Sequence, residues 1–195
     1  MRLLFLRHGR TTAPPSTFVG SRIDPGLDAH GREQATAAGR ILQQRPLAAV
    51  ICSPLRRARE TAAHALPGIT PRFDARLQEL DWGDITGLTW TEVEQQHPAV
   101  AADWIQAGWP QPPNGEDPRT LWRRVASALL DLHAENHDGD VLVVCHGGVI
   151  RAALGAARGL GLSDAWRVHT PHARLRVQHA TPLAIARWRA VLDVP

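Results

Sequence analysis

The sequence predicts an α/β fold, a three-layer α/β/α sandwich whose central sheet is mainly parallel. Three apolar runs have the length and composition of buried strands, and each is followed by a segment with helical spacing of apolar residues; the runs span residues 3–6, 48–52 and 141–145. This alternation is typical of a parallel sheet with helices on both faces. A chain of 195 residues is expected to form one domain, residues 1–195.

Each predicted helix has a start signal. The first is expected to begin after Asp28, whose carboxylate can cap the first turn, and to end near Arg45-Pro46. The second is expected to begin at Ser53, with Pro54 at its first position. The third is expected to follow Gly147-Gly148.

The last part of the chain predicts further strands. Residues 174–177 and 184–186 both alternate with a period of two, which is the pattern of a half-buried strand. These strands would join the sheet in mixed directions.

Tryptophan and proline concentrate between residues 80 and 124. Five of the seven tryptophans occur there: Trp82, Trp90, Trp104, Trp109 and Trp122. We expect an inserted helical cover, roughly residues 82–120, over the carboxyl ends of the strands, where α/β sheets bind ligands. Most of these rings should fill a core, although one or two could stack on a ligand.

Composition excludes several classes of function. The 22 basic residues exceed the 19 acidic ones by only three, and all 22 are arginine, so the charge does not indicate a nucleic-acid partner. Without lysine the chain cannot use a Schiff base or a P-loop lysine. The first apolar run stops at Arg7, too early for a membrane span, and only two cysteines occur, so we expect a cytoplasmic protein without disulfides.

Three polar motifs come directly after the three predicted strands. They are Arg7-His8-Gly9, Ser53-Pro54-Leu55-Arg56-Arg57-Ala58 and Cys145-His146-Gly147-Gly148. Because the carboxyl ends of parallel strands meet at one edge of a sheet, these motifs are expected to form one pocket. Two arginines and two histidines in that pocket predict an anion site that also holds a nucleophile.

Phosphoryl transfer through histidine fits these residue types. Guanidinium groups bind phosphate oxygens in a bidentate manner, which nominates Arg7 and Arg57, with His146 as a third donor and Gly147 beside it as a phosphate-binding residue. Unprotonated at its reacting nitrogen, His8 would accept the phosphoryl group and pass it to water. No cofactor and no metal are required.

The leaving alkoxide needs a proton, for which Glu79 is the candidate. A nearby phosphate dianion would favour the protonated carboxyl, which could donate its proton and later activate water as a base. Glu79 could also be a simple surface carboxylate.

Four segments in order resemble the histidine phosphatase superfamily, which has the phosphoglycerate mutase-like fold. Leu6-Arg7-His8-Gly9-Arg10-Thr11 resembles its Arg-His-Gly signature, and residues 53–62 fit its Ser-x-Leu-x-Arg-Ala-x-x-Thr-Ala pattern. Residues 144–148 resemble its second histidine motif, and residues 77–83 its acid-bearing segment. The resemblance implies a phosphoric monoester hydrolase that forms a phosphohistidine. Its register, rather than any local signal, selects Arg57 over Arg56.

A fifth segment resembles one branch of that superfamily. Residues 112–116, Pro-Pro-Asn-Gly-Glu, followed by Trp122-Arg123-Arg124-Val125, are similar to the Pro-x-Gly-Glu element of α-ribazole phosphatases. This resemblance implies α-ribazole-5′-phosphate, an intermediate of cobalamin biosynthesis, as substrate.

Alternatives stay open at this point. They are a phosphoglycerate mutase, a broad-specificity phosphatase for sugar or glycerate phosphates, and a binding module without catalysis. The expected partner is a small phosphate monoester, with neither nucleic acid nor membrane, and a homodimer is left open. His133 and His137 have a spacing that can bind metal, but without a neighbouring carboxylate or thiol motif they are expected to be structural.

Overall fold

Five strands form one sheet in the computed structural model, which describes residues 1–109 and 111–193. The strands are β1 (Arg2–Arg7), β2 (Leu47–Cys52), β3 (Arg72–Phe73), β4 (Asp140–Cys145) and β5 (Leu175–His179). Their order across the sheet is β3-β2-β4-β1-β5, with β5 antiparallel to β1 and the other pairs parallel. The predicted mainly parallel α/β fold is confirmed.

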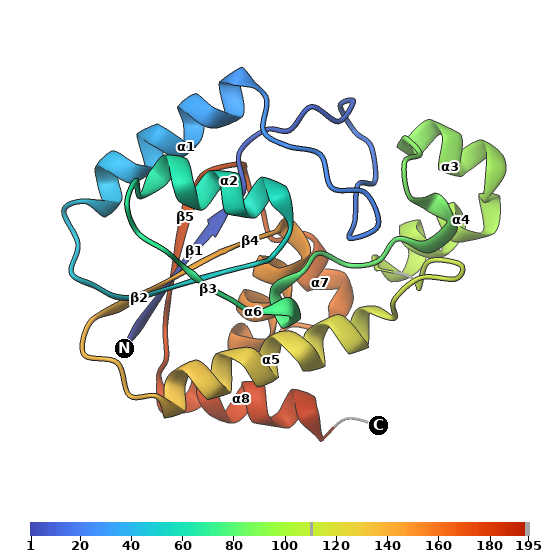
Figure 1. Ribbon diagram of the computed structural model, residues 1–195. Helices are drawn as coiled ribbons and strands as arrows, with labels where there is room; N and C mark the ends of the chain where they lie inside the picture. Colours follow the sequence, from blue (N-terminus) through green and yellow to red (C-terminus); the bar gives the residue numbers. More distant parts are fainter. Residues whose placement is uncertain (110, 194–195) are drawn as a thin grey trace.

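Helices cover both faces of this sheet (Figure 1). They are α1 (Ala29–Leu42), α2 (Arg56–Ala65), α3 (Trp90–Gln96), α4 (Pro98–Ala107), α5 (Pro118–Ala134), α6 (Gly147–Arg158), α7 (Leu162–Trp166) and α8 (Pro182–Leu192). Two short 3₁₀ turns, η1 (Ala75–Leu77) and η2 (Gly83–Ile85), connect β3 to α3. In Figure 1, α1 and α2 lie on one side of the strands and α5, α6 and α8 on the other.

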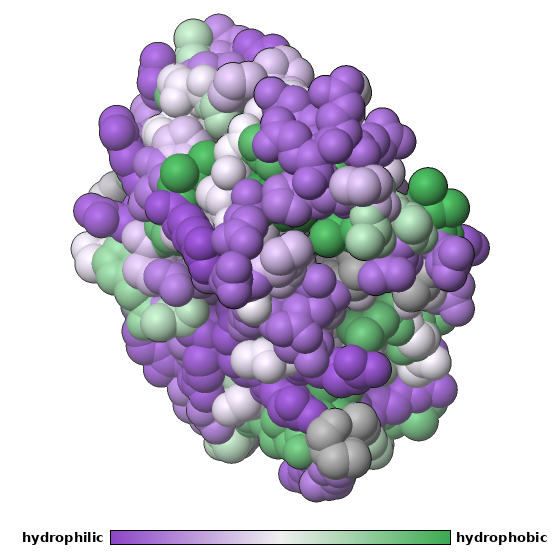
Figure 2. Space-filling model, turned by 90° about the vertical axis from the view of Figure 1, so that its right-hand side faces the viewer, coloured by the Kyte–Doolittle hydropathy of each residue, from purple (hydrophilic) through white to green (hydrophobic). Residues whose placement is uncertain are grey.

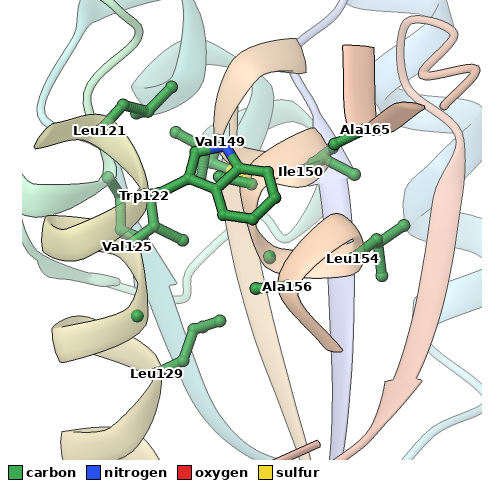
Figure 3. Close-up of a cluster of buried hydrophobic side chains, with 14 of the residues drawn as sticks. Leu121, Trp122, Val125, Leu129, Val149, Ile150, Leu154, Ala156 and Ala165 are labelled. Atoms are coloured by element: carbon green, nitrogen blue, oxygen red, sulfur yellow. The ribbon is translucent and has the colours of Figure 1, made fainter. Parts of the chain in front are cut away.

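Alternate residues of β1 show how the two cores divide. Leu4 and Leu6 pack with α1 and α2, whereas Leu3 and Phe5 pack with the larger core under α5, α6 and α8. This is the period-two geometry of a strand that is buried on both faces. Figure 3 shows the centre of the larger core, where the apolar stripe of α5 meets that of α6; the residues labelled there include Leu121, Val125, Ile150 and Leu154.

The helix starts agree with the sequence in two of three cases. Asp28 caps α1 by accepting a hydrogen bond from the backbone N–H of Gly31 at 2.6 Å, and α6 begins at Gly147. The expected start of α2 at Ser53 is wrong, because Ser53 N donates to Val144 O at 2.9 Å and so continues the ladder of β2. The helix therefore begins at Arg56, and the expected end of α1 near Arg45 moves back to Leu42.

Of the two late strands, one is confirmed and one is wrong. Residues 175–179 form β5, but residues 184–186 lie in α8. Thr181 caps this helix by accepting from Ala184 N at 3.2 Å, and Pro182 occupies its first turn, where proline's missing N–H costs nothing. The buried Ala184, Ile185 and Trp188 share one helical face. Burial of this face stabilises the helix, although the short alternating pattern predicted a strand.

The tryptophan-rich segment contributes α3 and α4, which lie on the side of the molecule toward which β1 points (Figure 1). Trp82, Trp104, Trp109 and Trp122 are buried, and Trp90 packs against the same core. From this side the surface is mostly hydrophilic, with hydrophobic residues in small separate groups (Figure 2). The rings therefore mainly fill a core. None of the described helices is long and apolar enough to cross a membrane.

Candidate active site

Three parallel strands end at the same point and bring the polar motifs together. Arg7 pairs with Cys145 in the ladder between β1 and β4, so His8 and His146 follow adjacent strand ends. A cavity of about 820 Å³ opens there. Arg7, His8, Arg57, Glu79 and Gly147 line it, as do residues 10–20 of the loop before α1. His146 is fully buried beside His8 and is not among the lining residues.

His8 is held in one orientation. Its Nδ1 lies 2.8 Å from its neighbour's carbonyl, Gly9 O, and because a carbonyl only accepts, Nδ1 carries the proton and donates it. Nε2 is therefore the unprotonated nitrogen. Burial, together with the charges of Arg7 and Arg57, holds the pKa of His8 well below its ordinary value, so the ring is neutral at neutral pH.

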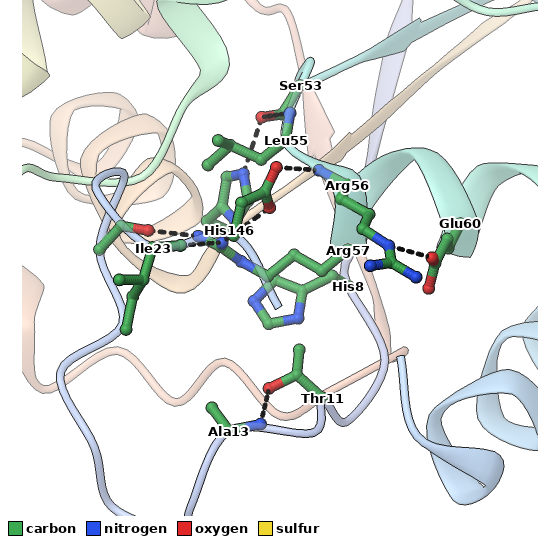
Figure 4. A network of polar contacts seen from close by, with 12 residues as sticks. His8, Thr11, Ala13, Ile23, Ser53, Leu55, Arg56, Arg57, Glu60 and His146 are labelled. Atoms are coloured by element: carbon green, nitrogen blue, oxygen red, sulfur yellow. Dashed lines mark hydrogen bonds and ion pairs between the residues drawn. The ribbon is translucent and has the colours of Figure 1, made fainter. Parts of the chain in front are cut away.

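Two guanidinium groups face this ring. Arg7 donates to Thr170 O at 2.7 Å, and burial lowers its pKa to about 10. Arg57 is 1% exposed and donates to Gly20 O at 2.6 Å. Arg56 instead is exposed and pairs with Glu60 at 2.6 Å, away from the histidines (Figure 4). The structure thus places Arg57, and not Arg56, in the pocket.

Several buried polar atoms of the pocket have no hydrogen-bond partner among the described residues. They are Arg7 Nε, Arg57 Nε, His146 Nδ1 and Thr170 Oγ1. Buried donors of this kind are costly unless a ligand or water completes them. Their concentration on and beside the two arginines of the cavity is what a site for an anionic ligand requires.

Ser53 has a role at the second histidine that the motif did not indicate. Its hydroxyl lies 2.7 Å from His146 Nε2, and both side chains are fully buried (Figure 4). The same hydroxyl accepts from Leu55 N at 3.4 Å. Among the described residues Nε2 is the only acceptor within reach of the hydroxyl proton, which assigns the ring proton of a neutral His146 to Nδ1. Burial, followed by the charge of Arg57, holds the pKa of His146 well below its ordinary value.

Glu79 lies opposite these groups, at the start of α6. Its Oε2 accepts from the backbone N–H of Gly148 at 3.1 Å, and its Oε1 from Leu80 N at 3.0 Å. Gly147 lines the cavity next to it, and a Cβ there would lie 3.1 Å from Arg151 Nη1 and 3.5 Å from Arg7 Cζ. The missing side chain leaves space between two guanidinium groups.

Gly9 allows two backbone segments to lie close together. A Cβ at this position would collide with the backbone carbonyl of Gly31, so Gly9 allows α1 to approach β1 closely. The hydroxyl of Thr61 accepts from Gly9 N at 3.0 Å and fixes this turn to α2.

Arg151 and His172 line the cavity and were not predicted from the sequence. Arg151 lies on α6 four positions after Gly147, a helical spacing that could have revealed it. Its guanidinium lies 4.4 Å from the ring centroid of Trp166. The ring of His172 lies 5.4 Å from that of His8, and no local pattern predicts this contact. Burial lowers the pKa of His172 to about 4.

The other histidine pair stays outside the site. His137 Nε2 lies 2.9 Å from Glu135 Oε2. In the part of the chain that the structure describes, no group of three or more His, Cys, Asp or Glu side chains could hold a metal ion.

Comparison with known proteins gives one family. Residues 3–184 match the family model of the histidine phosphatase superfamily (branch 1). A glucosyl-3-phosphoglycerate phosphatase of Mycolicibacterium vanbaalenii is 35% identical over 179 residues, which cover 86% of this chain and 78% of that protein. A bifunctional protein of Mycobacterium tuberculosis is 34% identical over 90% of this chain, but the chain spans only 49% of its length.

Solved structures agree with this assignment. A mycobacterial glucosyl-3-phosphoglycerate phosphatase superposes with a TM-score of 0.81 at 30% identity, covering 90% of this chain and 88% of that one. A putative α-ribazole-5′-P phosphatase from Escherichia coli gives a TM-score of 0.81 at 26% identity, covering 91% and 89%. Relatives with two different substrates are therefore similar to this chain to nearly the same degree.

Proposed function

This chain belongs to the histidine phosphatase superfamily, branch 1, and we propose that it hydrolyses phosphate monoesters through a phosphohistidine formed on His8. One observation carries the proposal: His8 presents an unprotonated Nε2 in a cavity that Arg7 and Arg57 also line. A neutral imidazole between two guanidinium groups is a nucleophile already in contact with the charges that bind its substrate.

The proposed reaction has two steps. Nε2 of His8 attacks phosphorus while Arg7 and Arg57 neutralise the phosphoryl oxygens, the ester P–O bond breaks, and Glu79 gives its proton to the leaving oxygen. The Glu79 carboxylate then takes a proton from water, whose oxygen attacks phosphorus and breaks the P–N bond. Inorganic phosphate and free His8 result. In this scheme His146 Nδ1 is a further donor to the phosphoryl oxygens.

Trapping the intermediate tests this proposal. After rapid quenching of a reaction with ³²P-labelled phosphate ester, the protein should carry one acid-labile, alkali-stable label, and EDTA should not prevent it. His8→Ala should lose the label, whereas His64→Ala, a change at an exposed histidine of α2, should keep it. Absence of a phosphoenzyme under all conditions would contradict the proposal, and transfer of the label to a second glycerate hydroxyl would indicate a mutase.

For the substrate we propose α-ribazole-5′-phosphate as the first candidate. Support comes from the Pro-Pro-Asn-Gly-Glu segment and from the similarity to the Escherichia coli protein. Trp82 and Trp166 line the cavity, where an aromatic leaving group could stack. We also propose that residues 82–120 form a cover for this leaving group.

A second candidate is favoured by Arg151. Among the described residues its only hydrogen-bond acceptor is Trp166 O, at 2.9 Å, which leaves both terminal amino groups free toward the cavity. Arg57 already forms an ion pair with Asp24, at 3.4 Å, whereas among the described residues no carboxylate forms an ion pair with Arg151. A carboxylate on the leaving group would balance the charge of Arg151, as in glucosyl-3-phosphoglycerate.

A substrate panel separates the two candidates. Release of inorganic phosphate is measured from α-ribazole-5′-phosphate, glucosyl-3-phosphoglycerate, phosphoglycerates, sugar phosphates and nucleotides under the same conditions. The physiological substrate should exceed the others in kcat/KM by at least about 10-fold, which corresponds to about 1.4 kcal/mol of transition-state binding.

A further inference from the structure

One arginine of α5 binds the backbone of the segment that carries Glu79 at several points. Arg124, on α5, uses all five of its N–H groups. Nη1 donates to Arg76 O at 2.7 Å and to Gln78 O at 2.6 Å, and Nη2 donates to Glu79 O at 3.3 Å. The remaining two N–H groups form a bidentate pair with Glu116, at 2.7 and 2.8 Å.

Glu116 belongs to the Pro-Pro-Asn-Gly-Glu segment, which also binds the chain just beyond Glu79. Glu116 N donates to Asp81 O at 2.9 Å, and Asp84 N donates to Pro113 O at 2.9 Å. No Cβ can be accommodated at Gly115, where it would lie 2.6 Å from Asp81 O. This segment therefore supports residues 81–84, while Arg124 supports residues 76–79.

Neither side chain lines the cavity. Arg124 and Glu116 are 19% and 16% exposed, so their pairing is largely shielded from water. A shielded arginine that forms a bidentate pair and also donates to the carbonyl oxygens of residues 76, 78 and 79 holds the backbone more firmly than a surface ion pair does. Glu116 also supplies the negative charge that compensates Arg124 beside Glu79.

We propose that Arg124 and Glu116 are positioning residues that hold the carboxyl of Glu79 at the distance needed to protonate the leaving oxygen. The inference rests on the proposed function, because it assigns to the pair a role that is exerted only through Glu79. Displacement of a catalytic group by about 1 Å can cost about 100-fold in rate. Loss of the pair should therefore matter most when the leaving group needs a proton.

The leaving group supplies the readout. Glu79→Gln should lower kcat/KM, which reports the steps up to release of the leaving group, by about 100- to 10,000-fold for an alkyl phosphate and far less for p-nitrophenyl phosphate, because p-nitrophenolate leaves without protonation. Arg124→Met should show the same selectivity with a smaller loss. The loss should be about 10- to 100-fold for the alkyl phosphate and less than about 3-fold for p-nitrophenyl phosphate. In the Arg124→Met, Glu79→Gln double variant, Arg124→Met should add nothing to the loss from Glu79→Gln.

Two further variants keep the test decisive if Arg124→Met does not fold. Glu116→Gln retains the shape of the partner and should give the same selectivity more weakly. Arg124→Lys should not restore activity, because an ammonium has three donors and cannot span three carbonyls and a carboxylate.

Arg2→Met is the matched control. Arg2 forms a similar bidentate pair with Asp140, at 2.6 and 3.0 Å, at the opposite end of the sheet. The Arg2→Met variant should change the free energy of unfolding without changing how the rate depends on the leaving group. Equal losses on both substrates, or additive losses in the double variant, would overturn the positioning role. A Glu79→Gln enzyme without leaving-group dependence would instead refute the acid role of Glu79.

Discussion

The hydroxyl of Ser53 lies 2.7 Å from Nε2 of His146, in a region that water does not reach. Among the described residues Nε2 is the only acceptor within reach of the hydroxyl proton, so this proton points to Nε2. The residue that follows β2 thereby determines which nitrogen of the histidine after β4 carries a proton. With its proton on Nδ1, His146 can donate to an anion. In the other tautomer a lone pair would face that anion.

Ser53→Ala should redistribute the ring proton of His146 and lower kcat/KM about 10-fold, the effect of one buried hydrogen bond left incomplete. Nitrogen-15 NMR of histidine-labelled protein reports the tautomer directly. Ser127, on α5, accepts a hydrogen bond from Arg76. Ser127→Ala removes this hydroxyl and should change neither the nitrogen-15 signal of His146 nor kcat/KM. An unaltered His146 tautomer in Ser53→Ala would refute this role.

The adjacent arginines of α2 provide a comparison inside one helical turn. Arg57→Ala should lower kcat/KM about 100- to 1,000-fold, because a charge-assisted phosphate contact is lost from a low-dielectric site. Arg56→Ala removes an exposed pair with Glu60 and should stay within about 3-fold. The two variants are compared by measuring kcat/KM for p-nitrophenyl phosphate. Similar losses from both changes would contradict the assignment of Arg57.

These residues also show what sequence could and could not predict. His8, His146 and Arg7 were predictable because each follows or ends a strand of a parallel sheet, where chain ends converge. Arg57 was distinguishable from Arg56 only by family register, since both occupy the same turn. Ser53 was assigned to a helix cap, because a serine before proline has the local pattern of one.

His172 and Thr170 could not be predicted for a physical reason. They lie in a turn that is held by Ala173 N donating to Arg7 O at 3.0 Å and by Arg7 Nη1 donating to Thr170 O. Both bonds join residues more than 160 positions apart, so no local pattern contains them. The strand predicted at residues 184–186 was wrong for a different reason, because here the deciding signals were local. A short alternating pattern lost to a capped helix with a buried tryptophan, Trp188.

Arg151 should distinguish substrates by charge. Arg151→Gln should lower kcat/KM for 3-phosphoglycerate by about 10- to 100-fold, the contribution of one charge-assisted hydrogen bond or pair, and leave glycerol 3-phosphate almost unchanged. The two esters differ mainly by the carboxylate. Arg158→Gln, at the exposed end of α6, is the control. Equal losses on both esters would mean that Arg151 binds the phosphate itself.

Folding stability should fall in acid. The pKa of His172 is about 4 and those of His8 and His146 are also lowered, whereas in the unfolded chain histidine titrates near 6.5. Below about pH 6.5 the unfolded chain therefore binds protons that the folded protein does not. The free energy of unfolding should then decrease as the pH falls from about 6.5 toward 4.

His172→Asn should make this decrease shallower. Burial opposes protonation of the ring most, the charges of Arg7 and Arg10 oppose it as well, and Asp28 favours it more weakly, so together they hold the pKa of His172 down. Urea unfolding at several pH values measures the slope. His64→Asn, at an exposed position, should leave the slope as it is. An identical slope in wild type and His172→Asn would refute the contribution of this residue.

Gly148 offers a way to move Glu79 without altering a polar group. A Cβ on Gly148 would collide with Oε1 of Glu79 and lie 3.4 Å from Leu121 Cδ2, so the carboxyl must turn away. Alanine is otherwise the better helix former by about 1 kcal/mol, so the variant should fold. Gly148→Ala should lower kcat/KM about 10- to 100-fold for an alkyl phosphate and much less for p-nitrophenyl phosphate.

Gly161→Ala is the matched control, because a Cβ there meets nothing within 4 Å. In Gly148→Ala, a loss that is independent of the leaving group would show that the added methyl group disturbs phosphate binding at Gly147. A loss confined to the alkyl ester would show that the position of the Glu79 carboxyl, and not merely its presence, limits the first step. The Glu79→Gln, Gly148→Ala pair then completes a cycle. Non-additive losses there require that both changes act on the same proton transfer.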